Sequence, residues 1–196
     1  MENDSQMIKI EEKDRCCGCY ACYNACPVNA ISMVEDEKGF KYPKVDEKKC
    51  INCGLCEKVC PILNKTEKNN NDVKAFAMYN KNEEERMKSS SGGVFSLIAK
   101  AILSEDGVVF GASFNEENEV VHIEVNSVDD LDKIRRSKYV QSKIGDTYKR
   151  AKKYLESGKK VLFTGTPCQI NGLYSFLQKD YENLYTQDII CHRSSF

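Results

Sequence analysis

The apolar residues of the second part of the chain, residues 73–196, recur with two different periods. A period of two, or a short continuous apolar run, predicts a strand, whereas apolar residues three and four positions apart predict a helix. The predicted strands are residues 73–80, 107–114, 119–125, 159–165 and 184–191. The strands 107–114 and 119–125 are expected to pair around the polar turn NEEN.

Helical spacing recurs in four places between these strands. The first helix is predicted from the apolar series Val94, Leu97, Ile98, Ala101 and Ile102. A second helix is expected to begin near Ser127, and a third covers residues 145–158 with Tyr148, Ala151 and Leu155 on one face. A fourth follows the tight loop after the strand 159–165. Strands that alternate with helices favour an α/β arrangement.

The N-terminal part is dominated by cysteines in a repeated pattern. In CCGCYACYNACP, the four cysteines Cys16, Cys19, Cys22 and Cys26 are separated by two, two and three residues, and a proline follows. The sequence CINCGLCEKVCP repeats this spacing with Cys50, Cys53, Cys56 and Cys60. Such a duplication is typical of two 4Fe-4S clusters, in which the fourth cysteine of each motif binds the other cluster.

This crossed pattern assigns two sets of ligands. Cluster one is expected to bind Cys16, Cys19, Cys22 and Cys60, and cluster two Cys50, Cys53, Cys56 and Cys26. Cys17 falls outside the spacing and is expected to be a structural neighbour. Gly18 and Gly54 lie inside the turns, where a missing side chain lets backbone amides approach a cluster.

Disulfides and zinc are the alternative explanations for these cysteines. A framework of four disulfides is typical of secreted chains, but the N-terminal sequence MENDSQMIKIEEKD has no apolar signal segment. Zinc sites also use paired two-residue spacings, although they need neither the third cysteine nor the repeated Cys-Pro. Two 4Fe-4S clusters are therefore the preferred interpretation, and a structural zinc protein is the alternative.

Composition bounds the compartment and the partners. With 196 residues, of which 41% are hydrophobic and 30% charged, the chain can form one or two folded domains. No apolar run approaches the ~20 residues needed to cross a bilayer, so no membrane span is expected. Eleven cysteines without an export signal indicate a reducing compartment, the cytoplasm, and exposed iron-sulfur chemistry suggests an anaerobe. A formal net charge of -1 argues against nucleic-acid binding.

These features predict three segments. Residues 1–63 are expected to form a dicluster ferredoxin-like domain whose clusters serve as its core, with a hairpin over residues 31–45. The polar, Asn-rich residues 64–72 are expected to be a linker. Residues 73–196 would form the α/β domain. The expected fold class is therefore α+β, a bacterial dicluster ferredoxin-like module followed by an α/β domain.

Two glycine-containing loops each precede a predicted helix: SSSGG, residues 89–93, and TGTPCQ, residues 164–169. The first turn of a helix offers unpaired N–H groups and a partial positive charge, so either loop could bind a phosphate or the edge of a flavin. Serine and glycine also simply cap helices at such places. The loops alone leave both explanations open.

Four segments follow the dicluster module in this order: SSSGGVFSLIAKAIL, SKYVQS, LFTGTPCQINGL and DIICH. Through these segments, the chain resembles the family of coenzyme F420 hydrogenase/dehydrogenase beta subunits. Members of this family are iron-sulfur flavoproteins that bind FAD. They pass electrons between clusters, flavin and a substrate such as coenzyme F420. The resemblance therefore implies an oxidoreductase with a redox partner protein or subunit and a small-molecule electron acceptor.

The resemblance also implies flavin contacts in three segments. Those from the first loop are Ser91, Gly92 and Gly93, and those from the segment SKYVQS are Lys138, Tyr139 and Gln141. A second wall of the site would be formed by Gly165, Thr166, Pro167, Cys168 and Gln169. No catalytic residue is assigned.

Three further residues have simpler explanations. Cys168 precedes a helix, which could lower its pKa, but it could equally be a small buried residue. Cys191, followed by His192, matches a Cys-His pair of the family, and a core cysteine at a strand end explains it equally well. His122, inside an alternating strand, is expected to be a surface or packing residue.

The family pattern continues beyond Cys191 and His192 with a Gly- and Pro-containing turn and a long segment, whereas this chain reads RSSF. The resemblance therefore implies that the α/β domain is incomplete at its C-terminus. FAD binding by this chain is then expected to be weak or absent. The alternative function is a stand-alone dicluster electron carrier with a non-catalytic α/β domain.

Overall fold

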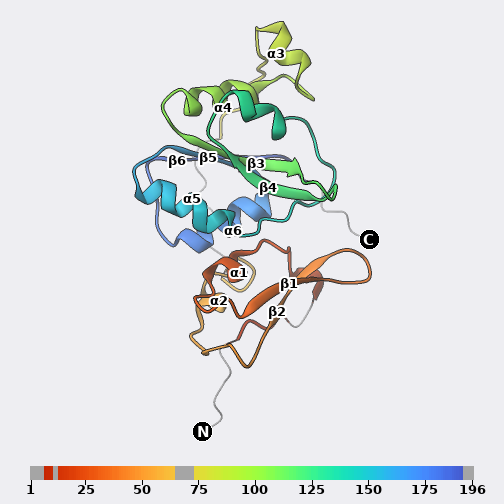
Figure 1. Ribbon diagram of the computed structural model, residues 1–196, viewed down its shortest axis with the longest axis vertical. Coiled ribbons are helices and arrows are strands. Elements are labelled where there is room, and N and C mark those ends of the chain that lie inside the picture. The colour runs from red at the N-terminus through yellow and green to blue at the C-terminus, as the bar shows by residue number, and fades with distance from the viewer. Residues whose placement is uncertain (1–6, 11–12, 65–72, 192–196) are drawn as a thin grey trace. The chain divides into compact units, whose positions relative to one another are not determined.

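The computed structural model describes residues 7–10, 13–64 and 73–191 (Figure 1). The chain divides into two compact units. The first unit contains Met1–Thr66 and Pro167–Asp180, and the second contains Glu67–Thr166 and Tyr181–Phe196. Most of the predicted linker lies outside the described residues, so its bounds stay a prediction.

The first unit consists of short elements. They are the 3-10 helix η1 (Lys13–Arg15), the helices α1 (Ala21–Ala25) and α2 (Leu55–Lys58), the strands β1 (Ile31–Glu35) and β2 (Lys41–Val45), and α6 (Pro167–Leu177). Helix α6 comes from the second part of the sequence, yet it packs beside α1. The expected ferredoxin-like module is present, and one helix from far along the chain is added to it.

The predicted hairpin is confirmed. Strands β1 and β2 pair antiparallel, with Ile31 opposite Val45 and Glu35 opposite Lys41. The carboxylate of Asp36 accepts hydrogen bonds from the backbone N–H groups of Lys38 and Phe40, both at 2.9 Å. Gly39 has a φ of 85°, which favours glycine. Local turn chemistry therefore explains why this hairpin was predictable.

Cysteines form much of the buried core of the first unit. One cluster of buried residues joins Ile8, Ala30 and Ile31 to the side chains of Cys22, Cys26, Cys56 and Cys60. A second cluster contains Cys19, Ala21 and Val59. Since few large apolar side chains take part, this small unit gains little stability from ordinary hydrophobic burial. That bound clusters complete this core stays a prediction.

The second unit is built on a four-stranded sheet in the order β4-β3-β5-β6. The strands are β3 (Val108–Phe114), β4 (Val120–Val125), β5 (Val161–Gly165) and β6 (Leu184–Asp188). Strands β3 and β4 pair antiparallel, as predicted for the segments around the turn NEEN. Strand β5 pairs parallel with both β3 and β6. The predicted α/β character of this part is therefore confirmed.

Two helices cover opposite faces of this sheet (Figure 1). Helix α4 (Val94–Leu103) packs against the face that carries Val109 and Leu162. On the other face Phe110 stacks on Phe163, and the ring of Tyr148 from α5 (Thr147–Glu156) contacts Phe163. Strand alternation explains this division, because successive side chains point to opposite faces.

Two predicted elements are confirmed with changes. Helix α4 forms where expected, but Ser96, Ala99, Ile102 and Leu103 are its buried residues, while Leu97 and Ile98 are exposed. The helix expected near Ser127 is the 3-10 helix η2 (Asp129–Lys133). The Ser127 hydroxyl accepts a hydrogen bond from the backbone N–H of Asp130 at 3.3 Å, which explains where this element begins.

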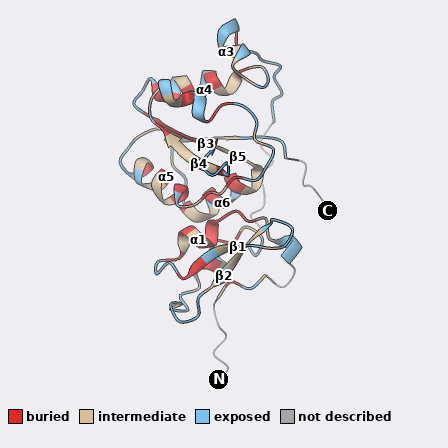
Figure 2. Ribbon diagram, turned by 45° about the vertical axis from the view of Figure 1, so that its right-hand side comes forward, coloured by how far each residue is buried: buried red, intermediate tan, exposed pale blue. Residues whose placement is uncertain are grey.

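The predicted strand 73–80 is wrong. These residues adopt no regular structure, and Val73 and Phe76 are 95% and 72% exposed. Alternation is a local signal, whereas a strand needs a paired neighbour, and within the described residues none of the strands pairs with this segment. The short helix α3 (Glu83–Met87), which the sequence did not predict, follows it, and Figure 2 colours much of this helix as exposed.

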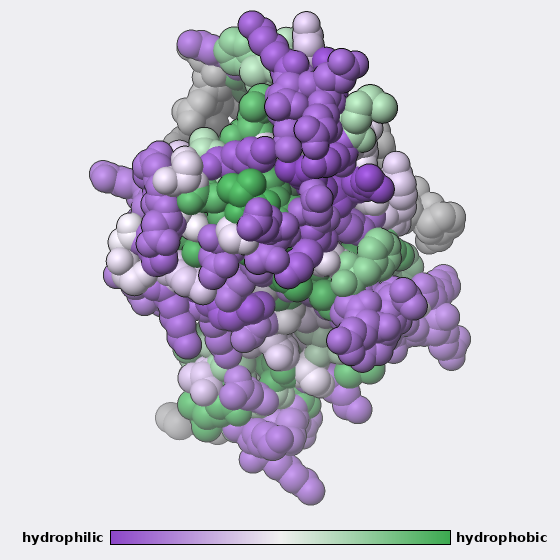
Figure 3. All heavy atoms as spheres, turned by 45° about the horizontal axis from the view of Figure 1, so that its top comes forward, coloured by the Kyte–Doolittle hydropathy of each residue, from purple (hydrophilic) through white to green (hydrophobic). Residues whose placement is uncertain are grey.

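The surface is mostly polar on the face drawn in Figure 3, where apolar side chains reach solvent in separate groups. The exposed large apolar residues include Met78, Tyr139 and Ile190. Within the described ranges, none of the helices has the length and apolarity needed to pass through a membrane.

Candidate functional site

Two cavities in the first unit are lined by the eight cysteines of the repeated motif. The first cavity is lined by Cys16, Cys19, Cys22 and Cys60, together with Cys17. The second is lined by Cys26, Cys50, Cys53 and Cys56. Each cavity therefore receives three cysteines from one motif and one from the other, which is the grouping that the crossed pattern requires. Ligation itself stays a prediction.

The two cavities are similar in size. Their atom-free volumes are similar, about 310 and 300 Å³. Within the described residues, no three side chains of His, Cys, Asp or Glu are grouped so that they could hold one metal ion. Four motif cysteines line each cavity, which is the number of thiolates that a four-iron cluster needs.

The two motifs reach the cavities through equivalent backbone turns. Gly18 and Asn52, the third residues of the two motifs, have φ values of 59° and 53°. Tyr20 and Gly54, the fifth residues, have φ values of 64° and 71°. Both copies thus need a left-handed residue at the same two positions, and glycine fills only one in each. The sequence indicated Gly18 and Gly54 but gave no sign of Tyr20, which is buried and adopts a conformation that is costly for a large side chain.

Backbone amides hydrogen-bond several of these sulfurs. The N–H of Ala30 donates to Cys26 Sγ at 3.2 Å. Burial raises the pKa of both Cys16 and Cys22. A backbone hydrogen bond from Gly18 to Cys16, and one from Tyr23 to Cys22, lower the pKa by a smaller amount. Such bonds stabilise thiolate sulfur and tune the reduction potential of a cluster. The residues present therefore fit two iron-sulfur clusters.

Burial dominates the titration of these thiols. It raises the pKa of Cys22 to about 12 and also gives Cys16 a pKa above its ordinary value. Without a metal these thiols therefore stay protonated at neutral pH. Binding of iron must release their protons, since the ligand is the thiolate.

Cys17 lies at the first cavity without belonging to the motif. A hydrogen bond with the Cys168 thiol lowers the pKa of Cys17, but a hydrogen bond with Cys19 and burial outweigh it and raise that pKa to about 12. Cys168, the second residue of α6, is half-buried. Its proximity to Cys17 could not be foreseen from the sequence, because it depends on where α6 packs.

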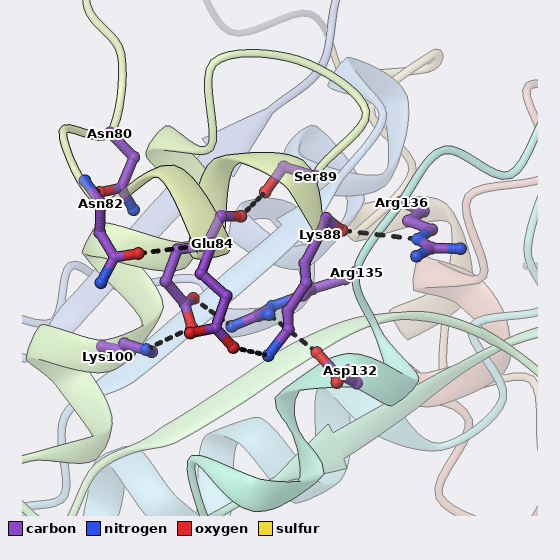
Figure 4. A network of polar contacts seen from close by, with 10 residues as sticks. Asn80, Asn82, Glu84, Lys88, Ser89, Lys100, Asp132, Arg135 and Arg136 are labelled. Atoms are coloured by element: carbon purple, nitrogen blue, oxygen red, sulfur yellow. Dashed lines mark hydrogen bonds and ion pairs between the residues drawn. The ribbon is translucent and has the colours of Figure 1, made fainter.

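In the second unit, the structure brings two of the predicted flavin segments together. The backbone N–H of Ser137 donates to Ser90 Oγ at 2.9 Å, which joins the segment SKYVQS to the loop SSSGG. Arg136 Nε donates to the carbonyl of Lys88 at 3.5 Å (Figure 4). Lys138 is half-buried, and desolvation lowers its pKa. Tyr139 and Gln141 are exposed.

Packing explains the two glycines of this loop without any ligand. A Cβ on Gly92 would lie 2.9 Å from the carbonyl oxygen of Met78. Gly93 has a φ of 74° and precedes the first residue of α4. The proposed role of both glycines in flavin binding therefore stays a prediction, with a structural explanation beside it.

A buried ion-pair network lies between the elements on either side of the loop SSSGG (Figure 4). Arg135, whose side chain is 5% exposed, contacts Glu85 at 2.6 Å and Asp132 at 2.8 Å. Lys100 of α4 contacts the other oxygen of Glu85 at 2.9 Å. Lys100 and Arg135 hold the pKa of Glu85 below its ordinary value. The network links α3, α4 and the segment after η2, and the sequence gave no sign of it.

His122 connects two more of the predicted segments. Its Nε2 donates to the carbonyl of Thr164 at 2.8 Å if Nδ1 accepts from the Ser142 hydroxyl at 2.7 Å. The ring stacks on Phe163 with centroids 5.3 Å apart. His122 is therefore a packing residue, one of the two alternatives expected, and it fixes the end of β5 relative to Ser142.

Acidification is expected to weaken the second unit through His122. Burial lowers the pKa of His122 to about 4, so the unfolded chain takes up a proton between pH 6.5 and 4 while the folded unit does not. Stability is then full above pH 6.5 and falls by about 2 kcal/mol from pH 7 to pH 5. Hydrogen exchange of the β4 and β5 amides measures this loss. His122→Asn should lack that part of the pH dependence, and identical profiles for the two proteins would contradict the assignment.

The remaining predicted residues are divided between the units. Gly165 ends β5 and Thr166 follows it in the second unit, whereas Pro167, Cys168 and Gln169 begin α6 in the first. Gln169 is buried and Cys191 is exposed, so Cys191 is not a core residue. His192 lies outside the described residues. The proposed second wall of a flavin site therefore stays a prediction.

Comparison with known proteins agrees with the arrangement of the cysteines. Residues 15–63 match the family model described as a 4Fe-4S dicluster domain. An uncharacterized ferredoxin of Methanocaldococcus jannaschii is 38% identical to this chain over 52 residues, which are 26% of this chain and 66% of the ferredoxin. The N-terminal part of the chain is thus a 4Fe-4S dicluster module.

Two relatives match most of the chain. A subunit of the F420H2 dehydrogenase of Methanosarcina mazei is 24% identical over 84% of this chain and 49% of its own length. The coenzyme F420-dependent sulfite reductase of Methanocaldococcus jannaschii is 29% identical over 86% of this chain and 26% of its own length. These matches confirm the resemblance to an F420 dehydrogenase-related family. The chain spans about half the length of the first relative and a smaller part of the second.

Proposed function

We propose that this chain is an electron-transfer component of an iron-sulfur oxidoreductase that acts on coenzyme F420 or a related soluble compound. The main support for this proposal is the pair of cavities, each lined by three cysteines of one motif and one cysteine of the other. Cys16, Cys19, Cys22 and Cys60 would hold one 4Fe-4S cluster, and Cys26, Cys50, Cys53 and Cys56 the other. The similarity to two F420-dependent relatives supports the acceptor class.

The chain's own residues would position and insulate these groups. When bound, the clusters would transfer one electron at a time. FAD would couple these one-electron transfers to a two-electron reaction of the substrate. Cys19, Cys22 and Cys60, which line the first cavity, are buried. Cys53 is exposed, so the second cavity is open to solvent at this residue. A redox partner protein or subunit would therefore approach the chain at Cys53, in the cytoplasm of an anaerobe.

Iron analysis tests the core of this proposal. Anaerobically purified protein should contain about eight irons and about eight acid-labile sulfides per chain, because two four-iron clusters are held. Electron paramagnetic resonance of the reduced protein should show two interacting clusters. A reproducible content of one cluster, or zinc in place of iron, would contradict the proposal.

A second candidate function is a stand-alone dicluster electron carrier with a non-catalytic second unit. Two observations favour this function. The close approach of Gly92 to the carbonyl of Met78 explains the need for glycine there, and Tyr139 and Gln141 are exposed to solvent. The flavin residues in this chain would then have structural roles only. Bound flavin distinguishes the two functions.

FAD titration is expected to give weak or no binding to this chain. The proposed contacts, Ser91, Lys138 and the residues around Thr166, offer a helix N-terminus and one cation, and this chain spans only 49% of the length of the F420H2 dehydrogenase relative. Extending the chain with the continuation from the F420H2 dehydrogenase relative should give tight binding, seen as a change in flavin fluorescence. The iron content should be the same in both proteins. Tight binding by the present chain would show that its site needs no further segment, and no binding by the extended chain would favour the electron carrier.

A further inference from the structure

The two cavities of the first unit differ in how far their lining residues are exposed. Three residues that line the second cavity, Val28, Ile51 and Cys53, are exposed to solvent. Among the described residues, those that line the first cavity are all buried or half-buried, and Tyr20 is one of them. Four motif cysteines line each cavity, so the two sites differ in their access to water rather than in their predicted ligands.

Tyr20 stands where the second motif has glycine. It is the fifth residue of its motif and corresponds to Gly54, and both residues are left-handed, with φ values of 64° and 71°. Glycine adopts this conformation at little cost, whereas a residue with a large side chain does not. The turn itself therefore gives no reason for a tyrosine. A residue in such a conformation persists where its surroundings hold it there, and its side chain is then the feature to explain.

The side chain of Tyr20 is enclosed within the first unit. The residue is 6% exposed, and its ring lies edge-on to the ring of Tyr23, with the centroids 5.7 Å apart. Tyr23 in turn packs against the buried core that contains Cys22 and Cys60. Tyr20→Gly would therefore remove a buried ring from a residue that lines the first cavity. The second cavity has no side chain at the equivalent position, Gly54.

We propose that the ring of Tyr20 keeps water from the first cavity and thereby lowers the reduction potential of the cluster bound there. This role rests on the proposed function, in which each cavity holds a 4Fe-4S cluster. Reduction adds negative charge, which costs more free energy where water is excluded, and solvent exposure is one of the factors that set the potential of a cluster. The site that Tyr20 encloses then has the lower potential of the two, and the site at the exposed Cys53 has the higher.

Redox titration of the metal-loaded, full-length protein, followed by electron paramagnetic resonance, tests this role. The unsubstituted protein should show two potentials, and Tyr20→Gly should raise the lower one and leave the higher one unchanged. Tyr20→Phe keeps the ring and should retain both potentials. Tyr20→Asn, with a small side chain that tolerates the left-handed conformation, should act like Tyr20→Gly. Unchanged potentials in Tyr20→Gly, a shift of both potentials, or an equal rise in Tyr20→Phe would overturn the proposal.

Removal of iron by a chelator measures the access of solvent independently. Loss of iron from the unsubstituted protein should have a fast phase from the second cavity, which has exposed lining residues, and a slow phase from the first. Tyr20→Gly should accelerate the slow phase several-fold and leave the fast phase unchanged, while Tyr20→Phe should match the unsubstituted protein. If Tyr20 only stabilised the fold, Tyr20→Gly would accelerate both phases, and this outcome would overturn the proposal.

Iron assays on the same samples separate this inference from the proposed function. About eight irons per chain in the unsubstituted protein and in Tyr20→Gly, with identical potentials, would overturn the role of Tyr20 alone. Loss of iron from both Tyr20→Gly and Tyr20→Asn would show that Tyr20 is needed to hold the cluster rather than to shield it, and would also overturn that role. Little iron in the unsubstituted protein would overturn the cluster assignment, and the role of Tyr20 with it.

Discussion

Cys26→Ser is expected to lower the iron content from about eight to about four atoms per chain, whereas Cys17→Ser should leave about eight. Cys26 belongs to the first motif in sequence but lines the second cavity with Cys50, Cys53 and Cys56. Its sulfur accepts the hydrogen bond from Ala30, an interaction of a positioned ligand. Iron and sulfide assays on anaerobic protein, with the spectrum of the reduced clusters, measure the loss.

Cys17 is a matched control because it lines the first cavity and lies beside the predicted ligand Cys16. Cys17→Ser tests whether every cysteine near a cavity is needed for cluster binding. The ligand assignment expects that only the cysteines of the two repeated motifs are needed. Equal iron loss from Cys17→Ser and Cys26→Ser would contradict the ligand assignment. Loss of cluster one in Cys26→Ser, with cluster two intact, would contradict the crossing.

The grouping around the cavities could be predicted because chemistry rather than packing fixes it. Four thiolates must surround each cluster, and the spacing of two, two and three residues allows only three of them to come from one motif. The hairpin and α5 were predictable for a related reason. Asp36 and Gly39 make a turn with local contacts, and Tyr148, Ala151 and Leu155 are the buried side of one helix.

Features that depend on distant neighbours could not be predicted. The segment 73–80 has the alternation of a strand, but the sequence cannot show that none of the strands in the described part of the chain pairs with it. Helix α6 was predicted as a helix, while its place in the first unit beside α1 depends on packing. Tyr20 adopts a left-handed conformation because the turn around the cavity imposes it. The contact between Cys17 and Cys168 follows from these same long-range contacts.

The ion pair of Arg135 and Glu85 joins residues distant in sequence and is likewise a tertiary feature. Its two side chains are 5% and 14% exposed, so both charges are largely removed from water. A buried charge that loses its partner keeps the cost of desolvation without the compensating attraction. Arg135 would retain only Asp132, whose side chain is 68% exposed. The network joins α3 to Lys100 of α4, and the loop SSSGG lies between these two helices in the sequence.

Glu85→Gln is therefore expected to destabilise the second unit by about 3 kcal/mol, because the buried Arg135 loses its charged partner. Hydrogen exchange of the β3 and α4 amides in metal-loaded protein measures the change. Glu84→Gln is the matched control, since Glu84 lies on the same helix but pairs with Lys88 at the surface, with its side chain 78% exposed. That substitution should cost less than about 0.5 kcal/mol. The double variant Glu85→Gln with Arg135→Met should recover part of the loss, because it removes the uncompensated charge. A similar, small effect of Glu84→Gln and Glu85→Gln would show that the buried pair does not stabilise the second unit.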